Sequence, residues 1–258
     1  MEEKRSKGMH SVSLSKRLSC VAQMVSPGAC VCDVGCDHGF VSIYLVQSGI
    51  AGHVLAMDVR KGPLSRAAEH VQEYGLCDYI EVRLSDGLAA VRDGERIDTA
   101  IMAGMGGLLM VRLIEDACKR GLRIPELVLQ PQSQWQQLRC FLRQSGYRIA
   151  QEDMILEEGK FYPVLRAVAG QTDMSDRVEK DRAQDAESVD MAAVGDLFGP
   201  LLLQAQNAVL RQYLLREKKK FQTIRERIAQ NGRCDASVEK QLVMLDMALQ
   251  MFAEEQQA

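Results

Sequence analysis

The stretch Val31-Cys-Asp-Val-Gly-Cys-Asp-His-Gly39 decides how the rest of this chain folds. The apolar run that leads into it from Ala29 predicts a buried strand, and the residues from Phe40 to Val46 continue at helical spacing. Between the two elements, Gly35 and Gly39 permit backbone angles and a close approach that a side chain would block. A strand that turns through glycines into a helix is typical of a nucleotide-cofactor loop.

The charge of this loop indicates which part of a cofactor it meets. Asp33 and Asp37 place carboxylates where a pyrophosphate would require positive charge, so we expect the loop to face an amino-acid or sugar moiety. Its two glycines also fail to complete the G-x-G-x-x-G spacing of dinucleotide-binding loops. Taken alone, an ordinary strand-turn-helix without a ligand remains the alternative.

The composition is that of a globular protein with a sizeable core, since 47% of the 258 residues are hydrophobic and 26% are charged. No apolar run reaches the length of a bilayer span, and the polar first ten residues lack the apolar core of a signal peptide. We therefore expect a cytoplasmic protein without membrane contact. The eight Cys form no C-x-x-C pair, so no metal site is expected.

Strands and helices alternate along the first two thirds of the chain. The expected strands after the first are 53–58, 79–84, 97–102 and 127–130, and the expected helices are 14–25, 63–74, 108–119 and 135–144. Five strand-then-helix units predict an α/β fold with a doubly wound, mostly parallel, Rossmann-like sheet. Strands at 147–156 and 161–168, separated by only four residues, predict a closing hairpin and bring the sheet to seven strands.

The last third of the chain has a different pattern. Residues 171–194 are polar and acid-rich, which predicts a flexible linker. From residue 195 to the end, apolar residues recur at helical spacing on both sides of Asn231-Gly232, and this predicts an antiparallel helical hairpin or short coiled coil. The expected domains are therefore a cofactor-binding domain at 1–170, the linker at 171–194 and the hairpin at 195–258.

Basic residues crowd the first helix of that hairpin. Seven Lys or Arg occur from Arg211 to Arg227 with only two acidic residues among them, although the net charge of the chain is −3. Such a cluster suits an RNA phosphate backbone. Its candidate RNA contacts are Arg211, Arg216, Lys219 and Lys220. A solvated helix face or a dimer contact is the alternative, and a monomer or a weak homodimer is expected.

Carboxylates follow three successive strands, at Asp33, Asp58 and Asp86. Each of the last two could be an ordinary helix cap. Yet a five-unit sheet closed by a hairpin resembles the class I S-adenosylmethionine (SAM) methyltransferases. This resemblance implies that Asp33 or Asp37 meets the methionine ammonium, that Asp58 takes both ribose hydroxyls, and that Asp86-Gly87 reads the adenine edge.

A narrower resemblance covers nearly the whole chain. Five pieces are similar to the bacterial TrmK-type tRNA methyltransferases: Leu14-Ser-Lys-Arg-Leu18, Asp33 to Gly39, Ala103-Gly-Met-Gly-Gly107, Gln130-Pro131 and Glu158-Gly-Lys-Phe-Tyr162. That family methylates N1 of adenine 22 in tRNA, so the resemblance implies SAM as cofactor and tRNA as partner. The cofactor contacts that it implies are Asp33, Gly35, Asp37, His38, Gly39, Asp58, Val59, Asp86, Gly87, Met102, Ala103 and Gly104.

The run from Ala103 to Gly107 stands where many base-amine methyltransferases carry Asn or Asp, two prolines and an aromatic residue. Without that side-chain clamp, we expect hydrogen bonds to the base edge from backbone groups of Ala103 to Gly106. Adenine N1 carries its own lone pair, so orientation and desolvation can supply most of the rate without a general base. The candidate catalytic residues are Asp37, His38, Gly104 and Met105, and for Asp37 and His38 the alternative is a role in holding the loop.

The closing hairpin is expected to turn at the cofactor edge of the sheet. This would place Lys160, Phe161 and Tyr162 near the reacting methyl, where an aromatic ring can hold a flipped base by its face. Packing in the core is the alternative for both aromatic residues. Arg17, Lys160 and Tyr162 are the expected substrate contacts at this edge.

Other functions remain open from the sequence. Within the same fold, the chain could methylate a small molecule, a protein or another RNA. Outside it, a nicotinamide-dependent oxidoreductase would need a second strand-helix half with its own catalytic residues, where this chain has a hairpin and helices. A non-catalytic scaffold would bind cofactor and RNA without transferring a methyl group.

Overall fold

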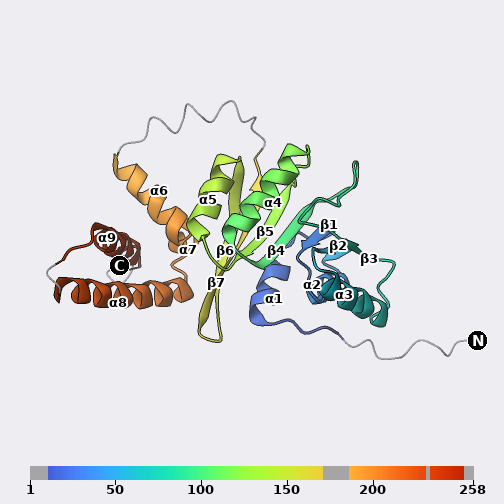
Figure 1. The fold of residues 1–258 in the computed structure, drawn as a ribbon, viewed down its shortest axis with the longest axis horizontal. Helices are drawn as coiled ribbons and strands as arrows, with labels where there is room; N and C mark the ends of the chain where they lie inside the picture. The colour runs from blue at the N-terminus through green and yellow to red at the C-terminus, as the bar shows by residue number, and fades with distance from the viewer. Residues whose placement is uncertain (1–10, 171–185, 231–232, 253–258) are drawn as a thin grey trace, which may run out of the picture.

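Apolar runs that are buried on both faces form the centre of one seven-stranded sheet, as expected for a mostly parallel sheet. The computed structural model describes residues 11–170, 186–230 and 233–252 (Figure 1). The strands are β1 (Ala29–Val34), β2 (Ala51–Asp58), β3 (Ile80–Leu84), β4 (Thr99–Met105), β5 (Glu126–Pro131), β6 (Tyr147–Glu157) and β7 (Lys160–Ala169). Their order is β3-β2-β1-β4-β5-β7-β6.

The direction of the strands brings the loops after β1 to β5 and the turn between β6 and β7 to one edge of the sheet. Strands β1 to β5 are parallel, β7 is antiparallel to β5, and β6 is antiparallel to β7. The turn between β6 and β7 therefore lies at the same edge as the carboxyl ends of β1 to β5. The predicted seven-stranded sheet with a closing hairpin is confirmed.

Helices cover both faces of the sheet. Helices α1 (Lys16–Gln23), α2 (Phe40–Gln47) and α3 (Lys61–Glu73) share one core with β1 and β2, in which Val21, Ile43 and Ala67 are fully buried. On the other face, α4 (Gly107–Lys119) and α5 (Trp135–Gln144) share a second core that includes Met110 and Leu138. None of the helices in the described ranges is both long and apolar enough to cross a membrane.

The expectation of five strand-helix units is wrong at β3. The segment 85–98 between β3 and β4 contains turns and no helix, so four strands of the parallel set are followed by a helix. Gly87 and Gly94 adopt left-handed backbone angles that interrupt a helix. The Arg83 guanidinium fixes the segment instead, because it donates to both carboxylate oxygens of Glu95, at 2.9 Å each, and to the Ala90 carbonyl.

The described C-terminal residues, 186–230 and 233–252, form four helices: α6 (Ala186–Phe198), α7 (Pro200–Gln204), α8 (Ala208–Gln230) and α9 (Ala236–Gln250). The linker prediction is therefore wrong for residues 186–194, which are helical, while 171–185 lie outside the described residues. The first predicted long helix is also broken twice. Gly199 has φ 102° and Pro200 starts α7, where its missing N–H costs nothing. Asn207 then caps α8 by accepting from two backbone N–H groups.

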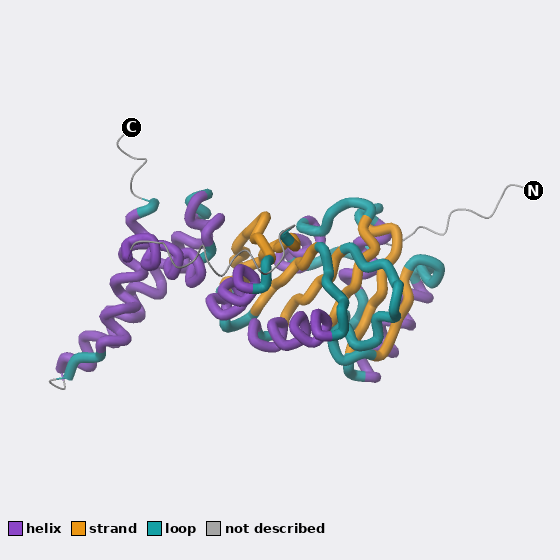
Figure 2. Tube along the Cα trace, turned by 90° about the horizontal axis from the view of Figure 1, so that it is seen from above, coloured by secondary structure: helices purple, strands orange, loops and turns teal. Residues whose placement is uncertain are grey.

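Helices α8 and α9 pair antiparallel. Lys218 binds Asp246 at 2.6 Å and Arg225 approaches Glu239 at 3.9 Å, so residues later in α8 meet residues earlier in α9. The predicted helical hairpin is thus present. It projects from the β6 end of the sheet, away from β3, and we call α6 to α9 the arm (Figures 1 and 2).

A buried ion pair attaches the arm to the sheet. Arg139 of α5 donates to Glu152 of β6 at 2.8 Å, and both side chains are fully buried. Arg139 also donates to the carbonyls of Asp196 and Leu197 at the end of α6. Glu152 accepts from the Leu201 N–H at the start of α7. The pair therefore caps two arm helices at their junction.

Candidate active site

The loop after β1 is fixed by hydrogen bonds to the neighbouring strand. The N–H groups of Gly35 and Cys36 both donate to the Met57 carbonyl at 2.8 Å. Gly35 and Gly39 have φ 77°, and Asp37 follows with φ 50°. A Cβ on Gly35 would lie 3.1 Å from Cε of Met105, so the loop is in close contact with the end of β4.

Asp33 lies buried at the start of this loop. Its side chain accepts a hydrogen bond from the Ser42 hydroxyl at 2.7 Å. Burial raises its pKa to about 6, although the bond from Ser42 opposes the shift. No ion pair to Asp33 is present within the described ranges. The site thus contains a carboxylate that would gain from a cation beside it.

Asp58 joins two loops at the end of β2. One carboxylate oxygen accepts from the Arg60 N–H at 2.8 Å, and the other accepts from the Asp37 N–H at 3.3 Å. The side chain is almost fully buried. The helix-cap alternative is wrong here, because Arg60 occupies the N-cap position of α3. Val59 beside it is 61% exposed at the mouth of the site.

Asp86 and Gly87 follow β3. Asp86 is exposed and pairs with Arg112 of α4 at 3.2 Å. It caps no helix, since none begins there. Gly87 has φ 58°, and a Cβ there would lie 2.5 Å from Leu113, so close packing against α4 already requires glycine. Packing against α4 therefore explains the glycine at position 87, whether or not adenine binds beside it.

Asp37 and His38 lie on the rim of the loop. The Asp37 carboxylate is 59% exposed and lies 3.7 Å from Arg60 and 3.8 Å from His38 Nε2. The His38 carbonyl lies 2.9 Å from His70 Nδ1 of α3, and the ring of Phe40 stacks on that of His70. These contacts tie the loop to α3, which is the structural role that the sequence left open for both residues.

The run from Ala103 to Gly107, which begins inside β4, contains a β-bulge. Strand β4 extends through Met105, beyond the expected end at Met102, and its register with β5 shifts between Ala103 and Met105. Gly104 at the bulge has φ 78°. Its N–H donates to the Gln130 side chain at 3.2 Å, so this one donor is already occupied, and contacts of the other backbone groups from Ala103 to Gly106 with a base stay a prediction. The Met102 side chain is fully buried, which leaves only its backbone for a ligand.

Gln130 connects this bulge to the substrate candidates. Its Oε1 atom also accepts from Arg17 Nη1 at 2.6 Å, and its Nε2 atom donates to the Pro131 carbonyl. The Arg17 guanidinium lies 5.3 Å from the centre of the Tyr162 ring. The structure therefore brings Arg17, Tyr162 and Gly104 together through one fully buried side chain. Sequence reasoning did not assign a role to Gln130, although the Gln130-Pro131 pair was the signal for it.

The neighbouring aromatic residue points elsewhere. Phe161 packs on Tyr213 of α8 with ring centroids 5.3 Å apart, which agrees with the packing alternative and not with a place beside the reacting methyl. The Arg216 guanidinium lies over the Phe161 ring at 4.4 Å and donates to the Gly159 carbonyl at 3.0 Å. Arg216, an expected RNA contact, thus holds the arm against the hairpin.

Comparison with known proteins identifies the family. A methyltransferase-domain family model matches residues 14–165. The tRNA (adenine(22)-N(1))-methyltransferase of Bacillus subtilis is 33% identical over 232 residues, 90% of this chain and 92% of that protein. The chain belongs to the TrmK-type tRNA methyltransferases.

Solved TrmK-type structures match both the sheet and the arm. Bacillus subtilis TrmK has a TM-score of 0.73 at 31% identity and covers 95% of this chain and 99% of its own. A candidate tRNA (m1A22) methyltransferase of Streptococcus pneumoniae, solved with SAM, has a TM-score of 0.77 at 31% identity and covers 92% of this chain and 100% of its own. Helices α6 to α9 are therefore part of the TrmK-type fold.

The remaining expected RNA contacts of this TrmK-type chain lie on its surface. Lys160 at the hairpin turn and Arg211 and Lys219 on α8 are exposed. Lys220 is also exposed and pairs with Glu217 at 2.9 Å.

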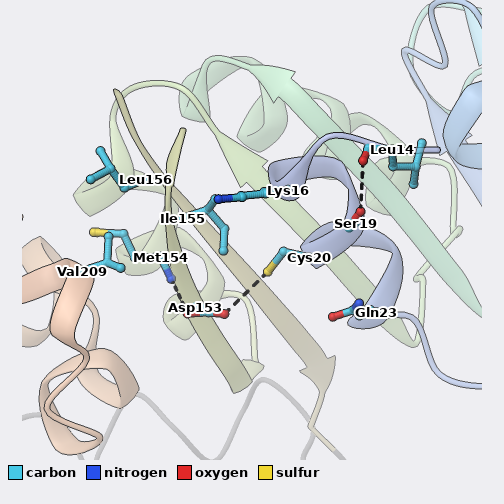
Figure 3. A pocket seen from close by; sticks show the side chains of 10 residues that line it. All are labelled: Leu14, Lys16, Ser19, Cys20, Gln23, Asp153, Met154, Ile155, Leu156 and Val209. Carbon is cyan, nitrogen blue, oxygen red and sulfur yellow. Dashed lines mark hydrogen bonds between the residues drawn. The ribbon is translucent and has the colours of Figure 1, made fainter. Parts of the chain in front are cut away.

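A groove of about 490 Å³ lies between α1, β6 and the start of α8, as Figure 3 shows. Asp153 in its floor accepts from Cys20 at 3.8 Å and from Asn207 at 3.1 Å. Burial, reinforced by Asp153, raises the pKa of Cys20 to about 12, so this thiol is not a nucleophile at neutral pH. None of the cofactor candidates lines the groove, and it is separate from the active site.

Proposed function

We propose that this protein transfers the methyl group of SAM to N1 of adenine 22 in tRNA. The observation that carries the proposal is the match to the Bacillus subtilis enzyme, which includes the catalytic sheet and the arm in one alignment. The cofactor loop and the acidic side chains at the strand ends support it. As tRNA is the substrate, we place the protein in the cytoplasm.

The residues at the strand ends fit SAM. Asp33 is a buried carboxylate without an ion pair in the described chain, and we assign it to the methionine ammonium. Asp58 has two carboxylate oxygens fixed by the Asp37 and Arg60 backbone, and we assign it to the ribose hydroxyls. Exposed Val59 offers an apolar surface to the adenine ring, and Asp86 offers an acceptor to its edge.

For this reaction the protein must orient the adenine against the methyl group and exclude water. Bound SAM supplies an electrophilic methyl on a sulfonium, and adenine N1 attacks it with its own lone pair, so the protein removes no proton before transfer. Tyr162 presents a ring face to the base, and Arg17 holds that ring from its other side. Gln130 fixes Arg17 and the Gly104 bulge in one geometry, which favours a reactive alignment.

The direct test is methyl transfer to a defined tRNA. An unmodified tRNA transcript with adenine at position 22 is incubated with the protein and SAM, and its nucleosides are analysed by mass spectrometry. The expected product is 1-methyladenosine at position 22, and a matched transcript with guanine at that position should gain none. Methylation of both transcripts, or of neither, would contradict the proposal.

A further inference from the structure

A second cleft lies between the segment that follows β5 and the arm. Its volume is about 380 Å³, within the range of small-molecule sites. One wall is the segment Gln132 to Gln137 that follows β5. The opposite wall is formed by α6, α8 and α9, through residues that include Tyr213, Phe221 and Gln241.

The first wall belongs to the same backbone that shapes the reaction site. The Gln132 N–H donates to the Met105 carbonyl at 2.9 Å, and the Gly107 N–H donates to the Ser133 carbonyl at 3.0 Å. Gln134 has φ 52°, a left-handed conformation that costs a non-glycine residue energy and is concentrated at functional sites. The cleft is thus a direct neighbour of the run from Ala103 to Gly107.

The lining has the chemistry of a nucleobase site. Side-chain amides both donate and accept, as base edges do, and five of them line this cleft: Gln132, Gln134, Gln136, Gln137 and Gln241. Trp135 and Phe221 supply aromatic surface on which a base can stack, while the Tyr213 ring already packs against Trp135 and Phe161. Among the described residues the lining contains one carboxylate, Glu217, which pairs with Lys220, and no Lys or Arg, so a phosphate is not the expected ligand.

Two polar groups in the lining favour a ligand that can accept hydrogen bonds. The Nε1–H of Trp135 is buried and has no hydrogen-bond partner in the part of the chain that the structure describes, and such groups are rare in folded proteins. Burial raises the pKa of Tyr213 to about 12, so its hydroxyl stays protonated at neutral pH. Bases present ring nitrogens and carbonyl oxygens that accept from such donors.

We propose that this cleft takes an unstacked nucleobase of the tRNA, adjoining the target adenine. The inference rests on the proposed function, because extrusion of the target adenine unstacks the bases next to it. The base lies with its face on the aromatic side chains and its edge against the glutamine amides. The cleft thereby selects the sequence or shape around the target.

The test combines removal of the amides with removal of the base. The variant is Gln136→Ala with Gln241→Ala, two partly buried helical positions where alanine is favourable. The control is Gln72→Ala, an exposed helical glutamine of α3 outside the cleft. Loss of two neutral hydrogen bonds should raise the KM for tRNA about tenfold, while the control should leave it unchanged.

The matching RNA change is an abasic nucleotide at each position next to the target adenine. At one of these positions the abasic tRNA should raise the KM of the wild-type protein about tenfold and have little further effect on the double variant. Such coupling identifies the base that occupies the cleft. The proposal would be overturned if the double variant had the wild-type KM for tRNA. It would also be overturned if the effects of the double variant and of the abasic nucleotide multiplied at every position.

A binding measurement separates the cleft from the catalytic proposal. When 2-aminopurine replaces each base next to the target adenine in turn, wild-type protein should quench its fluorescence at one of these positions, through stacking in the cleft, and the double variant should quench it less. This readout needs no methyl transfer. If wild-type protein forms no 1-methyladenosine but quenches the probe, the proposed function fails and the binding of a base in the cleft stands. If tRNA binds but the probe is not quenched at any of these positions, the cleft assignment is overturned.

Discussion

Replacing Arg139 by methionine should destabilise the protein more than any change on its surface. The substitution leaves the Glu152 carboxylate buried without its partner and removes the donor to the Asp196 and Leu197 carbonyls. Removing one member of a buried ion pair costs about 3 to 5 kcal/mol. For a chain of this size, each kcal/mol lowers the Tm by roughly 2 to 4 °C, so we expect a fall of about 6 to 20 °C.

Thermal unfolding followed by circular dichroism measures this effect, and a double-mutant cycle assigns it. Arg139→Met with Glu152→Met removes both charges, so the double variant should be more stable than the sum of the two single losses predicts. Arg143→Met is the matched control, since its guanidinium is half exposed beside Asp196 and its ion pair there should be worth less than about 1 kcal/mol. If Arg139→Met and Arg143→Met lowered the Tm equally, the reasoning would be refuted.

Four further changes test the active site and the arm. Asp58→Ala should raise the Kd for SAM at least ~100-fold, because two charge-assisted hydrogen bonds of about 1.5 to 3 kcal/mol each are lost; calorimetry measures it. Burial raises the pKa of Asp33 from 3.8 to about 6 in the free protein, so its ionisation lowers the free energy of unfolding as the pH rises from 4 to 6. The affinity for SAM should rise as the pH rises through about 6 and then become constant. Gly104→Val should lower kcat roughly 100-fold with SAM binding retained, because a β-branched residue is strained at φ 78° and shifts the bulge. Charge reversal at Lys219 and Lys220 should weaken tRNA binding and flatten its dependence on salt.

Each of these has a result that would contradict it. For Asp58, unchanged affinity in a folded variant removes the ribose assignment. For Asp33, an Asp33→Asn protein with the same pH profile as wild type removes the ammonium assignment. For Gly104, a normal rate in the valine variant shows that the bulge does not position the base. For α8, equal salt slopes for reversed and wild-type proteins move the RNA surface elsewhere.

Local patterns predicted those features whose causes are local. The apolar runs at β1 and β5 and the short gap between β6 and β7 fixed the strands and the hairpin, because burial and turn length act within a few residues. The roles of Gln130 and Arg216 were missed for the opposite reason. Gln130 binds Arg17 across 113 positions, and Arg216 binds Gly159 across 57. Such contacts depend on the finished fold and leave no spacing in the sequence.

The break in the arm at Gly199 shows why the role of a glycine is hard to predict from the sequence. Gly199-Pro200 was included in a continuous helix because the apolar spacing persists on both sides of it. In the structure, a Cβ at position 199 would lie 3.0 Å from Arg139 Nη2 and 3.1 Å from Glu152 Oε1. Glycine is therefore needed to let the backbone approach the buried ion pair, a requirement that only tertiary structure reveals.

The hairpin at β6 and β7 restricts how the chain can change in length. Successive side chains of a strand face opposite sides, and here Phe161 faces the arm while Tyr162 faces Arg17. Inserting or deleting one residue of β7 between Tyr162 and Leu165, where the pairing with β5 begins, would exchange the two faces and lose both contacts. Removing two residues from each strand would keep the faces and shorten the hairpin by about 7 Å. Homologous hairpins that keep both contacts should therefore differ in strand length by even numbers of residues.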